Sequence, residues 1–507
     1  MLIILAIFST HPLLIYPFDI YTHLQWIDEQ SFSTDAPSTR YMWHYIWSNI
    51  FDFLYITNQD ILLRAYIIHY TQFILTFIII FYVSRTFIQN LFTPISTTLL
   101  NDVALWSSLV WFTLLSTYSV NHHEIWIVWY SVNYQISLVF TLFILAMSIS
   151  LIFETLSLSK KIFYILMILG FSYIIIRIHA MEYIYYMMYL GVLLLIHIDI
   201  ILKWFKTHIY IAFAMLILSS ISIWQLAPYL QHYIYAKSKL LSYLSWDRLP
   251  LLLDEIEKHG DTILSHYNKA STTLNTFIYL SLFLILVFGF ILLYKSYKKS
   301  LLHINIRLVL FIFMSSLFIL IPLFQYSAGL AGLLTYDTVS HRFYFSSLLF
   351  LIVPSFVLYI MFSFKTSKLY IFHTSMIVIF MTTLLYSKHL SANSNYYKNI
   401  RSFTHMFIQD KRAFNLNSAQ IVAIGAQLNA YQTQHTQSKA LYYYARDDIA
   451  FVIKFIYRKP VLYQRRGSKD YQKSFQQHSD KNAHAILFEI PKAFPPYQRY
   501  ISRPALQ

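Results

Sequence analysis

The sequence predicts an all-α polytopic membrane protein with about eleven transmembrane helices, followed by a small external α/β domain at the C-terminus. Three observations support this prediction: the composition, a series of long apolar runs, and a rise in polar content near the end of the chain. Of the 507 residues, 57% are hydrophobic and 12% are charged, whereas roughly a quarter of the residues in a soluble domain are charged. A surface this apolar favours lipid as its solvent.

The apolar runs are long enough to cross a bilayer as helices. They lie at 2–17, 61–84, 103–120, 132–155, 162–178, 183–202, 207–228, 275–294, 308–327, 345–364 and 370–388. The first run has no basic N-terminal region and no small-residue cleavage site, so we interpret it as a retained helix and not as a signal peptide. Residues 1–389 therefore form the predicted transmembrane domain.

Basic residues between the runs predict the orientation, because cytoplasmic loops are enriched in Lys and Arg. With a cytoplasmic N-terminus, the short external loops hold only Arg40, Arg177 and Arg342. The cytoplasmic loops then hold many more: Arg85, Lys160, Lys161, Lys203, Lys206, Lys295, Lys298, Lys299, Arg307, Lys365 and Lys368. We therefore predict a bacterial inner-membrane protein whose C-terminal domain is external, in the periplasm.

The composition also excludes several classes of function. A formal net charge of +15 would suggest nucleic-acid binding in a soluble protein, but here membrane orientation explains the basic loops. The chain has no cysteine, so neither disulfides nor thiolate metal sites can form. With eight glycines in the whole chain, a glycine-rich loop for nucleotide phosphates is not expected.

Two external loops are longer than a minimal helical bundle needs. The loop at 18–60 contains YMWHYIWSNIFDFLYI at 41–56, whose dense aromatic residues predict a helix lying in the membrane interface. The loop at 229–274 contains LLDEIEKHGDTILSHY at 252–267, which is typical of an amphipathic surface helix.

The last 118 residues, 390–507, predict a separate external soluble domain, because polar residues become frequent there. Three short apolar runs are typical of strands: QIVAIGAQ at 420–427, KPVLYQ at 459–464 and HAILFEI at 484–490. DDIAFVIKFIY at 447–457 is more typical of a helix. Together these patterns predict the α/β domain.

Ionisable residues gather at the predicted external ends of the helices, where their energetic cost indicates a function. The first group follows the first helix and contains Asp19, His23, Asp28 and Glu29. A carboxylate at this position can act as a general base that accepts a proton from an attacking hydroxyl. The alternative interpretation is that Asp19 caps the N-terminus of a short helix.

The second group precedes the run at 345–364 and contains Asp337, His341, Arg342 and Tyr344. The guanidinium of Arg342 can bind a phosphate through two hydrogen bonds, and His341 and Tyr344 can add further ones. This arrangement favours a lipid phosphate held at the interface. Alternatively, Arg342 reaches the lipid head groups or pairs with Asp337.

Two predicted tight turns supply the remaining candidates, which we expect to face the same external cavity as Asp19. One turn, between 162–178 and 183–202, contains Arg177, His179 and Glu182; the other, between 103–120 and 132–155, contains His122, His123 and Glu124. Consecutive residues rarely bind one metal ion, and no HExxH spacing is present. We therefore expect substrate contacts or ordinary loop polarity here, and no metal.

This layout resembles the GT-C superfamily of membrane glycosyltransferases, which includes protein O-mannosyltransferases and the aminoarabinose transferases of lipid A. In that family a catalytic Asp follows the first helix in a large external loop, as Asp19 does here. A late external Arg-Tyr motif precedes a proline-containing helix, which HRFYFSSLLFLIVP at 341–354 resembles. The Asp28-Glu29 pair remains an alternative for the base, because family members often carry Asp-Glu or Asp-x-Asp at this position.

The resemblance implies an inverting transfer of a sugar from a polyprenyl-phosphate donor to a hydroxyl of an envelope glycan, lipid or protein. Asp19 would be the base and Arg342 would stabilise the departing phosphate; no cofactor is expected, although a divalent metal is an alternative. The competing hypotheses are an O-antigen-type polymerase or ligase, and a transporter or flippase of lipid-linked glycans.

Overall fold

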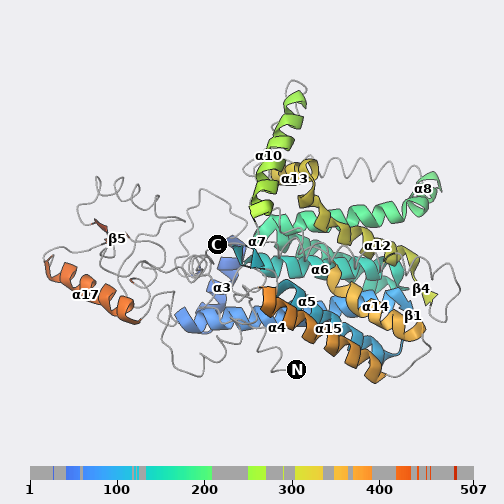
Figure 1. Ribbon diagram of the computed structural model, residues 1–507, viewed down its shortest axis with the longest axis horizontal. Coiled ribbons are helices and arrows are strands. Elements are labelled where there is room, and N and C mark those ends of the chain that lie inside the picture. Colours follow the sequence, from blue (N-terminus) through green and yellow to red (C-terminus); the bar gives the residue numbers. More distant parts are fainter. Residues whose placement is uncertain are drawn as a thin grey trace.

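The computed structural model describes the chain in segments, at residues 27, 41–56, 61–116, 119–120, 123–124, 133–207, 249–269, 289, 303–334, 348–363, 369–390, 418–434, 442–444, 453, 457 and 485–487. Within these segments the chain is mostly helical, and its long helices pack side by side in a bundle (Figure 1). Three of the described helices are long and apolar enough to span a membrane, at Ile67–Leu91, Gln135–Phe153 and Leu158–His179. These observations confirm a helical chain with apolar helices of membrane-spanning length, while the number eleven stays a prediction.

Helix α3 (Tyr41–Phe53) and the start of α4 (Ile61–Leu91) mark one end of the bundle, which we call the α3 end. The Arg64 guanidinium, in the first turn of α4, donates a hydrogen bond of 2.6 Å to the carbonyl oxygen of Ile56. The same guanidinium lies 4.9 Å from the centre of the Phe51 ring. The segment predicted as an interfacial helix is therefore helical and packs against the start of α4.

The opposite end is marked by β1 (Phe92–Thr93), which follows α4 directly, and we call it the β1 end. β1 pairs antiparallel with β4 (His303–Ile304). α5 (Thr97–Ser116) starts at this end and packs along α4. A short hairpin of β2 (Ser119–Val120) and β3 (His123–Glu124) follows α5.

Helix α6 (Asn133–Phe153) runs parallel to α4. Near its start, the amide nitrogen of Gln135 donates a 2.6 Å hydrogen bond to the Thr76 hydroxyl. Just after its end, Glu154 accepts a 2.9 Å hydrogen bond from the amide of Asn90. Thr76 lies in the middle of α4 and Asn90 in its last turn, so α6 begins beside the middle of α4 and ends at the β1 end.

Helix α7 (Leu158–Ile196) is a hairpin of two helical halves that meet at a break at His179. A straight helix of this length would measure about 58 Å. However, the Phe153 ring, just before α7, touches the His197 ring, just after it, with centroids 5.4 Å apart. α7 therefore starts and ends at the β1 end. This agrees with the prediction of two antiparallel helices at 162–178 and 183–202. Helix α8 (Ile198–Thr207) follows α7 directly.

Helix α12 (Ile306–Ser316) also starts at the β1 end and is capped by Asn305. The Asn305 backbone N–H donates to the Leu91 carbonyl at 3.0 Å, and its side chain accepts from the backbone N–H of Leu308. The chain then passes through the 3₁₀ helix η4 (Leu317–Leu323) into α13 (Gln325–Leu334). α13 is bent by 87° from the preceding helix, so this pair is either a broken span or a re-entrant segment.

Helix α10 (Leu249–Lys269) packs along α13 and confirms the predicted helix at 252–267. Figure 1 shows α10 extending away from the bundle beyond α13. Gln325, at the start of α13, donates a 2.8 Å hydrogen bond to Asp261 on α10. The charged residues of α10 are suited to an aqueous surface, as its predicted external position requires.

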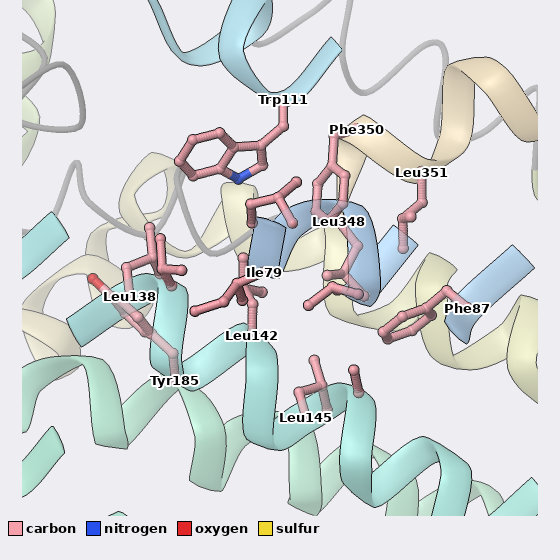
Figure 2. Close-up of a cluster of buried hydrophobic side chains, with 14 of the residues drawn as sticks. Ile79, Phe87, Trp111, Leu138, Leu142, Leu145, Tyr185, Leu348, Phe350 and Leu351 are labelled. Atoms are coloured by element: carbon pink, nitrogen blue, oxygen red, sulfur yellow. The ribbon is translucent and has the colours of Figure 1, made fainter. Parts of the chain in front are cut away.

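Helices α14 (Leu349–Ser363) and α15 (Leu369–Leu390) complete the described bundle. Figure 2 shows side chains of α14 meeting those of α4, α5, α6 and α7 in one apolar core, which includes Trp111, Leu142 and Phe350. Because lipid is as apolar as these side chains, close van der Waals packing stabilises such a core.

The C-terminal segment agrees with the predicted α/β character in one respect and differs in another. β5 (Tyr442–Tyr444) and β6 (Ala485–Leu487) form a parallel pair, and β6 falls within the strand predicted at 484–490. The strand predicted at 420–427 is wrong, because this run lies in helix α17 (Ser418–Gln434). The runs at 447–457 and 459–464 lie almost wholly outside the described residues.

Candidate functional site

Most residues predicted for the site lie outside the described part of the chain. They are Asp19, His23, Asp28, Glu29, His122, Asp337, His341, Arg342 and Tyr344. His123 and Glu124 form strand β3 of the hairpin after α5. The third group, Arg177, His179 and Glu182, is described in atomic detail and lies at the break of α7.

The break of α7 occurs at His179, whose backbone is extended with φ −163° and ψ 97°. Two hydroxyls of the neighbouring helix α6 hold both sides of this break. Ser137 donates a 3.1 Å hydrogen bond to the carbonyl oxygen of His179, and Thr141 donates one of 3.1 Å to the carbonyl oxygen of Glu182. Because the break frees backbone groups that a continuous helix would pair internally, these hydroxyls stabilise it.

The side chains of His179 and Glu182 meet at this break. Nδ1 of His179 is hydrogen-bonded to Oε2 of Glu182. When Glu182 is ionised its oxygens can only accept hydrogen bonds, and Nδ1 is then the donor. The Glu182 side chain is fully buried, and His179 is 9% exposed. The sequence placed these residues in one turn, and in the structure their side chains contact each other.

The second oxygen of Glu182, Oε1, is buried and has no hydrogen-bond partner among the described residues. A buried carboxylate is costly unless its oxygens are paired. An open acceptor at such a position is therefore suited to a hydroxyl group of a ligand or to water. Arg177, in the last turn before the break, is half-buried and adds a positive charge to the same helix end.

Buried polar residues that were not predicted for the site surround the α3 end. Arg64 is 3% exposed, and on α3 the side chains of His44 and Ser48 are buried on the same face as Trp47. Arg64 stands near the start of the apolar run at 61–84, and an arginine inside such a run is the signal that could have identified it.

A second polar contact lies between α4 and α6. The amide of Gln135 bonds the Thr76 hydroxyl, while its carbonyl oxygen Oε1 has no partner among the described residues. One turn before Thr76, both amide atoms of Gln72 are buried and unpartnered within the same described set. These amides are polar groups inside helices of membrane-spanning length, where unpaired groups are expensive.

The described part of the site can bind hydroxyl groups and protons through a carboxylate, an imidazole and nearby amides. Among the described residues, no group of three or more His, Asp or Glu side chains could hold a metal ion. Comparisons of the chain with protein-family models, with curated proteins and with solved structures found no match.

Proposed function

We propose that the chain is a membrane glycosyltransferase that moves a sugar from a polyprenyl-phosphate donor to a hydroxyl of an envelope glycan, lipid or protein. The reaction would take place on the external face of the bacterial inner membrane, at the α3 end of the bundle. The lipid carrier already activates the sugar, so the reaction needs no nucleotide-binding loop.

The observation that carries this proposal is the buried His179–Glu182 pair at the break of α7. A break with hydrogen bonds on both sides, and a carboxylate oxygen that has no partner among the described residues, is expensive in an apolar bundle, and a structural role does not require it. Sugars present several hydroxyl donors, and an open carboxylate oxygen is a suitable acceptor for one of them. The turn containing this pair is also one of those predicted to face Asp19.

In the proposed reaction, Asp19 removes the proton of the acceptor hydroxyl while that oxygen attacks the anomeric carbon. The bond from this carbon to the phosphate oxygen breaks, its electron pair leaves with the polyprenyl phosphate, and the anomeric centre is inverted. Arg342, with His341 and Tyr344, stabilises the charge on the departing phosphate. Glu182 and His179 bind sugar hydroxyls and orient the donor, which lowers the entropic cost of reaction.

A second candidate function, transport of a lipid-linked glycan, is favoured by the buried amides of Gln72 and Gln135. Transporters place polar groups within their helices, along a path through the bilayer. Both amides retain buried atoms without partners among the described residues. In that case the same sugar-binding groups would line the path of the glycan through the bilayer, and the bond between sugar and phosphate would stay intact.

The proposal predicts that Asp19→Asn and Arg342→Ala each remove the transferred sugar from the finished product. A gene-deletion strain is complemented with wild type or a variant at matched membrane levels, and envelope glycans and lipids are weighed by mass spectrometry. Because a general base contributes about 10²–10⁴ in rate, Asp19→Asn should reduce the product at least a hundredfold.

Asp52, which lies on α3 and is exposed, provides the control, and Asp52→Asn should leave the product unchanged. Full product with Asp19→Asn would assign Asp19 a capping role and direct the search to Asp28 and Glu29. If the deletion strain accumulates a complete lipid-linked glycan with no sugar missing, the transport function replaces the transferase.

A further inference from the structure

Four lysines are exposed at the β1 end, two in the first turn of α7 and two on α8: Lys160, Lys161, Lys203 and Lys206. The contact between Phe153 and His197 brings the start of α7 next to the start of α8. A 2.7 Å ion pair between Arg307 and Asp199 joins α8 to α12. These contacts place the four lysines together at the β1 end of the bundle.

The carboxylates described at this end contact other residues and form no ion pair with the four lysines. Glu154 accepts hydrogen bonds of 2.9 Å from both Asn90 and Ser150, and Asp199 is paired with Arg307. Asp102 lies 3.6 Å from Nε2 of His373. Within the described part of the chain, none of the four lysines forms an ion pair.

The positions of Lys160 and Lys161 also go against the local preference of a helix. The N-terminal turn carries a partial positive charge from the helix dipole, so lysine is unfavourable there and an anion is favourable. Ser157, the residue before α7, makes no side-chain capping hydrogen bond. An anion bound next to these lysines would stabilise the start of α7.

Large apolar side chains are exposed beside the same lysines. On α7, Leu158 is 73% exposed and Ile162 is 50% exposed; on α8, Ile200 and Leu202 are each slightly more than half exposed. Lysines next to exposed aliphatic side chains are typical of the boundary between lipid head groups and acyl chains. A soluble acidic partner or a nucleic acid would leave these aliphatic side chains uncovered.

We propose that the β1 end carries a binding surface for anionic phospholipid head groups, formed by Lys160, Lys161, Lys203 and Lys206. The acyl chains of the same lipids cover the aliphatic side chains of α7 and α8. This surface is independent of the proposed transferase and agrees with the predicted cytoplasmic position of these loops, because anionic lipids attract basic residues at that face.

The test compares two short-chain lipids that differ in head-group charge. The purified full-length protein in detergent is titrated with dioctanoyl phosphatidylglycerol or dioctanoyl phosphatidylcholine, and binding is followed by native mass spectrometry. Each lysine near the surface contributes about 1 kcal/mol, so Lys203→Gln should weaken phosphatidylglycerol binding about fivefold and leave phosphatidylcholine binding unchanged. The change from all four lysines to glutamine should abolish the preference.

Lys258→Gln is the charge-matched control, because Lys258 is an exposed lysine on α10, 3.8 Å from Glu255. An equal loss of binding with Lys258→Gln would show that only net charge matters and would overturn the proposal. Equal affinity of the wild type for the two lipids would overturn it too. A third overturning result is tighter binding of a single-stranded oligonucleotide that is lost in the same lysine variants.

Discussion

Gly329→Ala is expected to separate α13 from α10 and to lower the stability of the protein by about 1–3 kcal/mol or more, the cost of overpacking a close contact. A Cβ atom at Gly329 would overlap the backbone carbonyl oxygen of Ile256, and one at Gly260 would overlap the carbonyl oxygen of Gln325. Both obstacles are backbone atoms, which cannot move aside as a flexible side chain can. The two helices therefore touch backbone to backbone through two glycines.

Two measurements check this expectation. The first is the midpoint of thermal unfolding of the purified protein in detergent. The second uses the absence of native cysteine: Glu257→Cys and Gln325→Cys, at positions where the ends of the native side chains lie 3.5 Å apart, should be joined by a short thiol-reactive cross-linker in the wild-type background. The yield of cross-linked protein should fall strongly when Gly329→Ala is added.

The matched controls are Gly170→Ala and Gly191→Ala on α7, where a Cβ would meet no atom within 4 Å. Alanine favours a helix more than glycine does, so these variants should be neutral or slightly stabilised. If Gly329→Ala unfolds at the same temperature as Gly170→Ala and is cross-linked equally well, the close contact between α10 and α13 does not exist in solution.

The sequence was sufficient to predict elements whose signal is local. Apolar runs gave the positions of α4, α6 and both halves of α7, because a helix of membrane-spanning length needs about 20 apolar residues in a row. The break at His179 was predictable for the same reason, since Arg177, His179 and Glu182 interrupt two apolar runs. Helix α10 was predictable because its charged and apolar residues follow the pattern of an amphipathic helix.

Elements that depend on contacts between distant residues were not predictable. The run at 308–327 reads as one helix, yet the chain bends by 87° between α12 and α13. Pro322, which has no backbone N–H, lies within η4 between the two helices, but the direction of α13 depends on its contact with α10. The close contacts of Gly260 with the backbone of Gln325, and of Gly329 with the backbone of Ile256, likewise cannot be predicted from the sequence of either helix alone.

The strand prediction at 420–427 failed because a short apolar run has the same appearance in a strand and in a helix. In α17, Ile424 and Leu428 are both buried and lie one helical turn apart. The alanines at 419, 423, 426 and 430 favour the helix. Extending the window beyond the eight residues of the run would have revealed this period.

The candidate site shows the same division between local and distant information. The contact between His179 and Glu182 follows from a separation of three residues at a helix break. The burial of Glu182, by contrast, follows from packing against α6, which supplies Ser137 and Thr141. Glu182 was expected in a turn that faces the external cavity, but its side chain is fully buried in the folded protein.

His179→Leu is expected to be strongly destabilising, because it leaves the Glu182 carboxylate buried with neither oxygen paired. Breaking a buried charged pair by removal of one partner costs about 3–5 kcal/mol in other proteins. Glu182→Leu should cost less, since the imidazole that remains can be neutral. The double change to leucine at both positions should recover much of the loss, because replacement of a buried pair by apolar residues is often neutral.

The measurement is a double-mutant cycle on the free energy of unfolding of the purified protein in mixed micelles. His197→Leu is the control. His197 is a second histidine of the same region, directly after α7, and its Nδ1 forms a hydrogen bond of 3.0 Å with a backbone carbonyl oxygen instead of a carboxylate. That variant should cost about 1 kcal/mol, the value of one hydrogen bond. A His179→Leu protein that is no less stable than the double variant would mean that Glu182 is protonated or hydrated in the native protein. Its open oxygen would then no longer indicate a binding position for a sugar hydroxyl.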